Sequence, residues 1–267
     1  MIAIVTPQSV SLPQETLPQV TWNKLPDNFI LPNDPVDNQL QPLLAEALRE
    51  SLELAGLCTE LMLITTNFGL CATVGGKTVV KAPDWVYIPK VKSLSEGIIR
   101  RSYTPKLEGD LPLLVLEFIS ETEGGEYSIN SHYPYGKWYF YERILQVPLY
   151  GIFHPKTGEL DLFRLVNGRY ESQVPNENNH FWIAEMNLFL GVWNGERSQI
   201  STNWLRWWDQ SRNLLLWGKE IIDQEKQRVE QERQRADRVE AQLQQEQIER
   251  QRLIDRLKAL GVDDFSQ

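Results

Sequence analysis

Apolar side chains recur at helical spacing in the first regular segment of the chain. The recurring set is Leu40, Leu44, Ala47, Leu48, Leu52 and Ala55. Side chains at these intervals share one face of an α-helix. Asp37 before the segment is a favoured N-cap, and Gly56 after it is a favoured helix stop. The pattern therefore predicts an amphipathic helix between Asp37 and Gly56.

Short apolar runs separated by turn residues follow this helix. The runs cover residues 61–66, 70–74, 78–81 and 85–88. The separators are Asn67-Phe68-Gly69, Gly75-Gly76 and Pro83-Asp84. Short β-prone runs bounded by such residues predict strands joined by tight turns. We expect a meander of strands between residues 59 and 89.

Two later runs, residues 113–119 and 149–153, are almost wholly apolar. Such runs are expected of central strands that are covered on both faces. Between the two runs, polar residues 121–134 predict a loop and residues 137–145 predict a helix.

A second loop and a hairpin complete the body of the chain. Residues 89–112 are polar and predict a loop. Residues 159–166 alternate in hydrophobicity, and Asn167-Gly168 is a strong hairpin turn into residues 169–171. Strands interspersed with helices predict an α/β fold.

The two ends of the chain differ from the body. Residues 1–36 contain six prolines and no sustained period, so they predict an extended arm. Residues 224–230 and 231–237 repeat one heptad pattern, which predicts a long charged helix. One seam position holds Ile222, Val229, Ala236, Leu243, Arg250 and Leu257; the other holds Glu225, Glu232, Val239, Glu246, Leu253 and Leu260.

Half of the second seam position is glutamate, which weakens a coiled-coil interface. The pattern therefore leaves two alternatives for the tail. It is either a single helix or a coiled coil that pairs with a second copy in a homodimer.

Composition narrows the class of protein. The 267 residues suffice for one large domain or two small ones, and 42% are hydrophobic, as in a protein with a buried core.

The N-terminal residues do not resemble a signal peptide, and no apolar run has the roughly 20 residues of a membrane span. Cys58 and Cys71 lack metal-motif spacing and are expected to be reduced. These features predict a cytoplasmic protein without a membrane partner.

The formal net charge of −9 argues against a protein that coats DNA through counterion release. It does not exclude an enzyme that combines a small basic cleft with a metal ion. The sequence contains no phosphate-binding loop, no Gly-x-Ser-x-Gly motif and no His-x-x-x-His spacing, so it offers no sign of these other chemistries.

Candidate chemistry lies at Asp84, Glu117 and Lys137, each beside or within a predicted strand or helix. Carboxylates are ligands that Mg²⁺ prefers, and a nearby lysine can stabilise negative charge that develops on a phosphate. A glutamate in an apolar strand is unfavourable unless it is paired or binds a metal. Each residue also has an ordinary explanation: a turn aspartate, an exposed strand end and a solvated lysine.

The order of these segments resembles a bacterial restriction-endonuclease-like family of the PD-(D/E)XK nuclease superfamily. The family pattern is Pro-Asp before a strand, Glu-x-x-Ser at a strand end, Lys-x-x-x-Tyr on a helix, and then a further strand. The matching segments are Pro83-Asp84-Trp85-Val86-Tyr87-Ile88, Leu114-Val115-Leu116-Glu117-Phe118-Ile119-Ser120, Lys137-Trp138-Tyr139-Phe140-Tyr141 and Val147-Pro148-Leu149-Tyr150.

The resemblance implies a central mixed sheet flanked by helices and a DNA endonuclease that requires Mg²⁺ or Mn²⁺. The resemblance also implies that Asp84, Glu117 and Lys137 are catalytic and that Asp84 and Glu117 bind the metal. The domain prediction is an arm over residues 1–36, a nuclease-like domain over 37–215 and a helical tail over 216–267.

Two departures from the superfamily pattern stand out. The superfamily usually places its lysine two residues after the glutamate, where this chain has Ile119, so the role would pass to Lys137. An early acidic motif has no match before the first helix. Glu46 and Glu50 could replace it, although their charged surroundings favour a solvated helix face. An alternative function is therefore an inactive nuclease fold that recruits partners through its tail.

Overall fold

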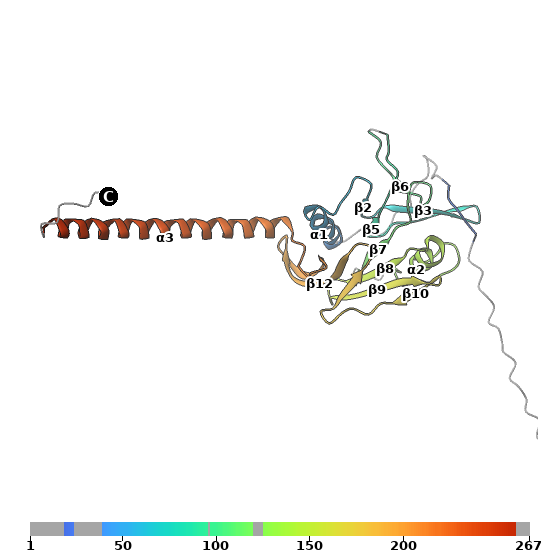
Figure 1. Ribbon diagram of the computed structural model, residues 1–267. Helices are drawn as coiled ribbons and strands as arrows, with labels where there is room; N and C mark the ends of the chain where they lie inside the picture. The colour runs from blue at the N-terminus through green and yellow to red at the C-terminus, as the bar shows by residue number, and fades with distance from the viewer. Residues whose placement is uncertain (1–18, 24–38, 96, 120–124, 260–267) are drawn as a thin grey trace, which may run out of the picture. The chain divides into compact units, whose positions relative to one another are not determined.

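The computed structural model describes residues 19–23, 39–95, 97–119 and 125–259 (Figure 1). The chain divides into two compact units, Met1–Leu215 and Leu216–Gln267, and each is considered by itself. Most of the predicted arm, and the expected N-cap Asp37, lie outside the described residues.

A six-stranded mixed sheet forms the centre of the first unit. Within the described part of this sheet, β7 (Leu114–Phe118) and β8 (Leu149–His154) run parallel, and the other neighbouring strands are antiparallel. In spatial order the strands are β10 (Arg169–Ser172), β9 (Glu159–Val166), β8 (Leu149–His154), β7 (Leu114–Phe118), β5 (Trp85–Ile88) and β2 (Leu63–Thr65). The predicted apolar runs at 113–119 and 149–153 become the two central strands β7 and β8. The α/β class and the mixed sheet are confirmed.

Two smaller sheets complete the unit. β3 (Gly69–Val74) pairs with β4 (Lys77–Lys81), β1 (Val20–Thr21) and β6 (Ser102–Tyr103). β12 (Leu188–Arg197) lies between β11 (His180–Ile183) and β13 (Ile200–Trp208).

The predicted meander needs correction. β3 and β4 leave the main sheet as a separate hairpin, so β2 pairs directly with β5. The residues of β3 are all buried, and β3 also pairs with β1 and β6, which come from other parts of the chain. The expected loop at 89–112 contains the short strand β6, which pairs in parallel with β3. Because this pairing joins residues far apart in the chain, the local sequence pattern did not indicate the strand.

Helix α1 (Leu40–Leu54) follows the predicted periodicity and ends before Gly56, whose φ of 70° lies in the left-handed region that favours glycine. Its buried face consists of Leu44, Ala45, Ala47, Leu48, Ser51 and Leu52. The indole Nε1 of Trp207 in β13 donates a hydrogen bond of 3.1 Å to the Leu48 carbonyl. The helix is therefore anchored against the three-stranded sheet.

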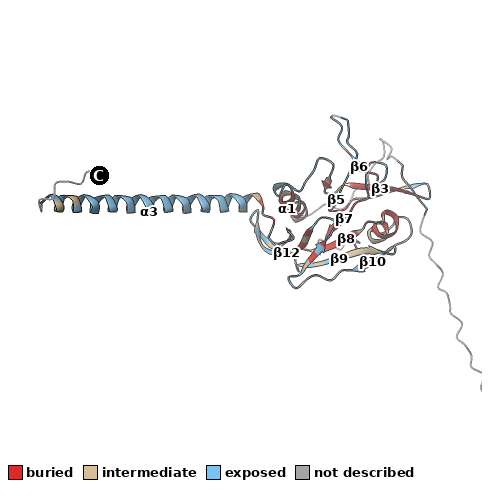
Figure 2. Ribbon diagram, in the orientation of Figure 1, coloured by how far each residue is buried: buried red, intermediate tan, exposed pale blue. Residues whose placement is uncertain are grey.

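The second predicted helix is present but changes its winding. α2 (Lys137–Tyr139) continues directly into η1 (Phe140–Leu145), which is π-helical. All six residues of η1 are buried, as the red colour of this segment indicates in Figure 2. π-Helical turns are rare and often occur at functional sites.

The main core lies between η1, one face of the central sheet and the β3–β4 hairpin. It includes Leu70, Val79, Val86, Ile88, Val115, Phe140, Tyr141, Ile144, Tyr150 and Ile152. Val86, Ile88, Val115 and Ile152 share this face because strand side chains alternate between the two faces. The core therefore fixes which residues of β7 turn towards η1.

In its described part, the second unit consists of Leu216, the buried Trp217 and one long helix, α3 (Gly218–Ala259), and no residue of this helix is buried. Across the described ranges, no helix combines the length and apolar character needed to cross a bilayer.

Candidate active site

Glu117 is a fully buried carboxylate within β7, with 0% of its surface exposed. It stands two residues after Val115, so both side chains turn towards η1. Hydrophobic burial of the neighbouring strand positions thus carries an acidic group into the core. A buried carboxyl group of this kind requires partners to offset the loss of hydration.

Helix residues supply those partners. The Tyr141 hydroxyl donates a hydrogen bond of 2.9 Å to Oε1 of Glu117. The Lys137 ammonium lies 3.1 Å from Oε2 of the same carboxylate. Lys137 and Tyr141 are four residues apart, and side chains at this spacing meet on one helical face. The Lys-x-x-x-Tyr spacing therefore places both side chains on the same side of Glu117.

Asp84 approaches Glu117 from the neighbouring strand. β5 and β7 are antiparallel with Trp85 opposite Leu116, so extending the register by one residue sets Asp84 opposite Glu117. Directly opposite side chains lie on the same face of a sheet, with Cβ atoms about 5 Å apart. Oδ2 of Asp84 also accepts a hydrogen bond of 2.6 Å from the Phe118 backbone N–H. The two carboxylates and the lysine are thus brought to one place.

The shared site changes the protonation of Glu117. Burial raises the pKa of Glu117 to about 8, and the Asp84 charge acts in the same direction, while Lys137 and Tyr141 oppose the rise. Glu117 therefore holds its proton to a higher pH than an ordinary glutamate does. Burial would lower the pKa of Lys137, but the charges of Glu117, Asp84 and Glu126 outweigh it and raise that pKa. Lys137 remains a cation.

Glu126 is a further carboxylate at the site that the sequence did not indicate. It is 7% exposed, and its Oε1 lies 3.9 Å from the Lys137 ammonium. The Tyr150 hydroxyl donates a hydrogen bond of 2.9 Å to the Glu126 backbone carbonyl, which holds the loop in place. Glu126 lies in a polar loop without periodicity, so no local pattern distinguishes it. Tyr141, in contrast, was detectable from its spacing to Lys137.

The first helix contributes an amide to the end of β7. Nε2 of Gln41 donates a hydrogen bond of 2.9 Å to the Phe118 carbonyl. Glu50 forms an ion pair of 2.6 Å with Arg197 of β12, and Glu46 is exposed. Glu50 is therefore paired with β12, Glu46 faces solvent, and α1 contributes the amide of Gln41 near the site.

The donor set suits Mg²⁺ or Mn²⁺ in one respect: it offers hard carboxylate oxygens on facing strands. Within the described ranges, no group of three or more His, Cys, Asp or Glu side chains is arranged to hold a metal ion. Mg²⁺ commonly binds through one or two carboxylates and keeps several waters. The pair Asp84 and Glu117 fits that mode, with most of the coordination left to water and substrate.

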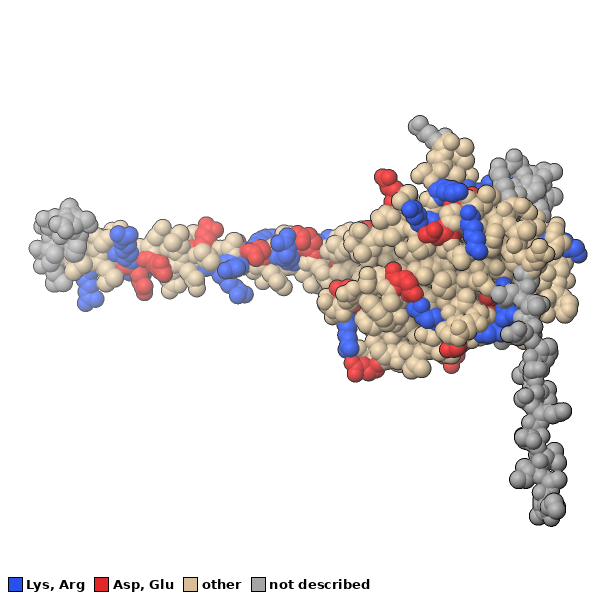
Figure 3. All heavy atoms as spheres, turned by 45° about the vertical axis from the view of Figure 1, so that its right-hand side comes forward, with Lys and Arg blue, Asp and Glu red and all other residues tan. Residues whose placement is uncertain are grey.

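The visible surface does not form a broad basic field. Figure 3 shows Lys and Arg interspersed with Asp and Glu across one face of the described residues. Strong electrostatic attraction of the phosphate backbone usually needs clustered basic side chains. The surface agrees with the acidic net charge of −9.

The mixed sheet, its flanking helices and the converging carboxylates define a restriction-endonuclease-like α/β protein. A family model with the description "Uma2: Putative restriction endonuclease" matches residues 25–198. The chain belongs to this Uma2 family. A search of curated proteins finds no match. Membership places the chain in a family associated with nuclease function, and restriction-endonuclease-like families generally use divalent metals.

Proposed function

We propose that this protein is a metal-dependent endonuclease that hydrolyses phosphodiester bonds in DNA. The observation that carries the proposal is the approach of the Lys137 ammonium to within 3.1 Å of Glu117, with Asp84 opposite Glu117 in the strand register. An ordinary solvated lysine would have no reason to lie between buried carboxylates. The cytoplasmic location expected from the sequence stays a prediction.

Asp84 and Glu117 would hold the cation, with Mg²⁺ or Mn²⁺ as the candidates. Such a cation, when bound, neutralises charge on the phosphate and assists activation of the attacking water. The hydrogen bond from the Phe118 N–H orients the Asp84 carboxylate, and the Tyr141 hydroxyl orients that of Glu117. These bonds reduce the reorganisation needed when a cation enters.

Lys137 has the role of a positively charged group beside the reacting phosphate. Its side chain is 18% exposed, so the ammonium is shielded from most solvent while its position is constrained by carboxylates. A charge held in a partly dehydrated site stabilises developing negative charge more strongly than the same charge in water. Lys137 would also help to orient the attacking water.

The proposal is tested with the full chain on supercoiled plasmid DNA, linear DNA and single-stranded RNA. Cleavage is expected with Mg²⁺ or Mn²⁺ and is expected to stop when EDTA exceeds the metal. Comparison of the substrates measures the preference for DNA. Undiminished cleavage in excess EDTA, or no cleavage of any substrate with either metal, would contradict the proposed activity.

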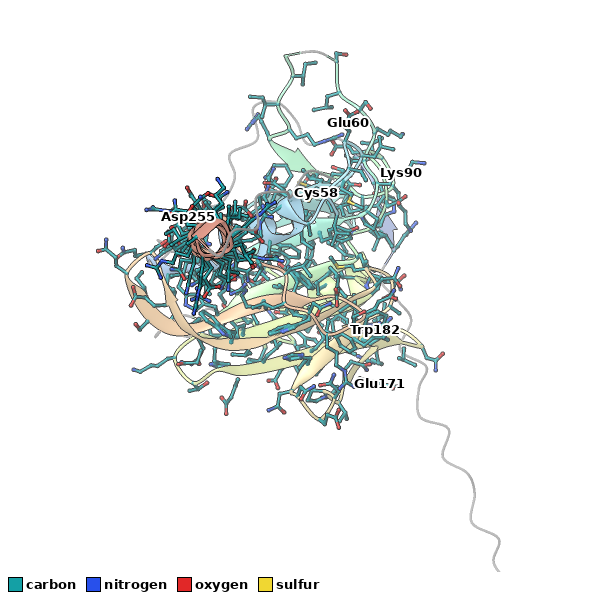
Figure 4. The ribbon with its side chains drawn as sticks, turned by 60° about the vertical axis from the view of Figure 1, so that its left-hand side comes forward. Cys58, Glu60, Lys90, Glu171, Trp182 and Asp255 are labelled. Atoms are coloured by element: carbon teal, nitrogen blue, oxygen red, sulfur yellow. The ribbon has the colours of Figure 1, made fainter. Side chains whose placement is uncertain are left out.

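Replacing Lys137 by alanine is expected to lower the rate of DNA cleavage by about 10²-fold, the scale of losing one preorganised charge-stabilising donor. Mn²⁺ binding should be retained because the two carboxylates remain. Cleavage rate and Mn²⁺ affinity, the latter by isothermal titration calorimetry, are measured on the same preparations. Lys90→Ala is the matched control, since Lys90 is an exposed lysine of the same unit, labelled in Figure 4. Equal rates for Lys137→Ala and this control would remove Lys137 from the mechanism.

Mn²⁺ affinity is expected to increase with pH up to about 8, the pKa of Glu117. Below this pH the cation must displace a proton from the carboxyl group, so the apparent affinity falls by roughly tenfold per pH unit. Calorimetry between pH 6 and 9, in buffers of different ionisation enthalpy, measures both the affinity and the protons released. A flat affinity with no proton release would exclude Glu117 as a ligand.

An inactive nuclease fold that recruits partners is the second candidate function. The exposed side chains of α3 favour it, because none of the residues of this helix is buried. Self-association of the chain through a coiled coil is compatible with either function. Intact wild-type protein that binds neither Mg²⁺ nor Mn²⁺ would support the second candidate over the first.

A further inference from the structure

Most of the large exposed apolar side chains of α3 lie at the two seam positions of the heptad, whereas Ile221 and Ile248 are exposed outside them. Ile222, Val229, Val239, Leu243 and Leu253 have exposed fractions of 55%, 58%, 57%, 55% and 60%. Seen almost end-on in Figure 4, α3 projects side chains around its whole circumference, with Asp255 labelled among them. A long helix without a buried face gains little from tertiary packing. The seam positions therefore form a surface that pairing with another helix would cover.

A parallel, in-register pair of α3 helices would bring equivalent residues together. Glu225, Glu232 and Glu246 would each meet the same glutamate of the second copy at one seam position. Arg250 would meet its own equivalent at the other seam position. Four seam positions would therefore oppose like charges, which destabilises that arrangement.

An antiparallel pair resolves much of this conflict. In antiparallel coiled coils, residues of one seam position face residues of the other. Setting Val229 opposite Leu253 of the second copy also sets Val239 opposite Leu243. The same register brings Arg250 opposite Glu232, so opposite charges meet within the seam.

The remaining seam positions do not reverse this preference. Glu246 faces Ala236 and Glu225 faces Leu257 in the antiparallel register, so no glutamate of the seam meets another glutamate. Each carboxylate can then turn towards solvent beside an apolar neighbour. The register thus combines apolar contacts, a complementary charge pair and the absence of like-charge contacts in the seam.

We propose that α3 is the dimerisation element of this protein and pairs with α3 of a second copy in the antiparallel orientation. The contact has two equivalent halves, as expected for a two-fold interface. Each half contains one Arg250–Glu232 pair between the copies. The arrangement does not depend on the proposed nuclease activity.

Charge reversal distinguishes the orientations. Arg250→Glu and Glu232→Arg are each made in the full chain, together with the double reversal. In the antiparallel dimer each single reversal creates two like-charge contacts and is expected to weaken dimerisation by roughly tenfold or more. The double reversal restores opposite charges and is expected to return the dissociation constant to within about threefold of wild type.

Sedimentation equilibrium measures the dissociation constants. Asp237→Arg and Arg252→Glu are matched controls, because both residues are exposed and lie outside the seam positions. Helical content by circular dichroism checks that each variant folds. Wild-type protein that stays monomeric at about 100 μM would overturn the proposal, as would a dimer unaffected by Leu243→Glu. A dimer that is as stable as wild type in both single reversals would overturn the antiparallel orientation, since in a parallel pair each reversal only exchanges one like-charge contact for another.

Discussion

Replacing Asp84 by alanine is expected to lower metal-dependent DNA cleavage by about 10³-fold, because the variant loses charge stabilisation that the bound cation would provide. Asp84 stands opposite Glu117 in the sheet register, so its removal leaves one carboxylate to hold the cation. Mn²⁺ affinity should fall together with the cleavage rate. Initial rates on plasmid DNA and calorimetric Mn²⁺ titrations measure the two effects.

The alanine also removes the acceptor of the Phe118 N–H bond, at 2.6 Å, and could disturb the strand end. Asp84→Asn separates the two effects, since its amide oxygen can still accept that bond while the charge is lost. Both variants should therefore be inactive, but only the alanine variant should be less stable. Glu171→Gln, at an exposed position of β10, is the control for loss of one carboxylate. Wild-type rates in Asp84→Asn would reject the site.

Replacing Glu117 by glutamine is expected to lower cleavage by a similar factor, about 10³-fold, while it stabilises the fold at alkaline pH. Glutamine nearly preserves the size of the buried side chain and can still pair with the Tyr141 hydroxyl. It cannot ionise, so it removes an acidic ligand and a buried negative charge together. A lower cleavage rate together with a higher stability would indicate that Glu117 serves catalysis at the expense of stability.

The direction of the stability effect follows from the raised pKa of Glu117. The folded state holds the Glu117 proton up to about pH 8, whereas the ordinary pKa is 4.5, so the folded state binds more protons between these values. Wild-type stability therefore decreases with rising pH across this window, and the glutamine variant lacks that component. Urea unfolding at pH 5, 7 and 9 measures the difference, which should grow in favour of the variant. A difference that is constant with pH would show that Glu117 is not held protonated.

Local patterns predicted most of the elements that surround the site. The helical spacing of Leu44, Leu48 and Leu52 produced α1, and the apolar runs produced β7 and β8. These signals are reliable because each depends on which face of a local element must be buried. β11, β12 and β13 had no comparable signal, since their glycines, asparagines and tryptophans interrupt a simple alternation.

Part of the candidate site could be predicted from the sequence, because its residues lie beside elements with clear burial patterns. Asp84, Glu117 and Lys137 each stand beside a recognisable strand or helix, and the structure brings them together. Glu126 could not be found in this way, because its position depends on a loop that folds back to Tyr150. Their catalytic roles stay predictions until the variants are measured.

The amino-acid sequence by itself determined the α/β class, the principal strands, the long charged helix and the three residues worth testing. Tertiary structure decided that Asp84 faces Glu117, that Tyr141 and Lys137 cover the same carboxylate, and that Glu126 joins them. The division has a physical reason. Periodicity reports burial within one element, whereas strand register and loop closure depend on residues far apart in the chain. The pKa of Glu117 is a product of that assembly, because burial and charge meet only after the chain has folded.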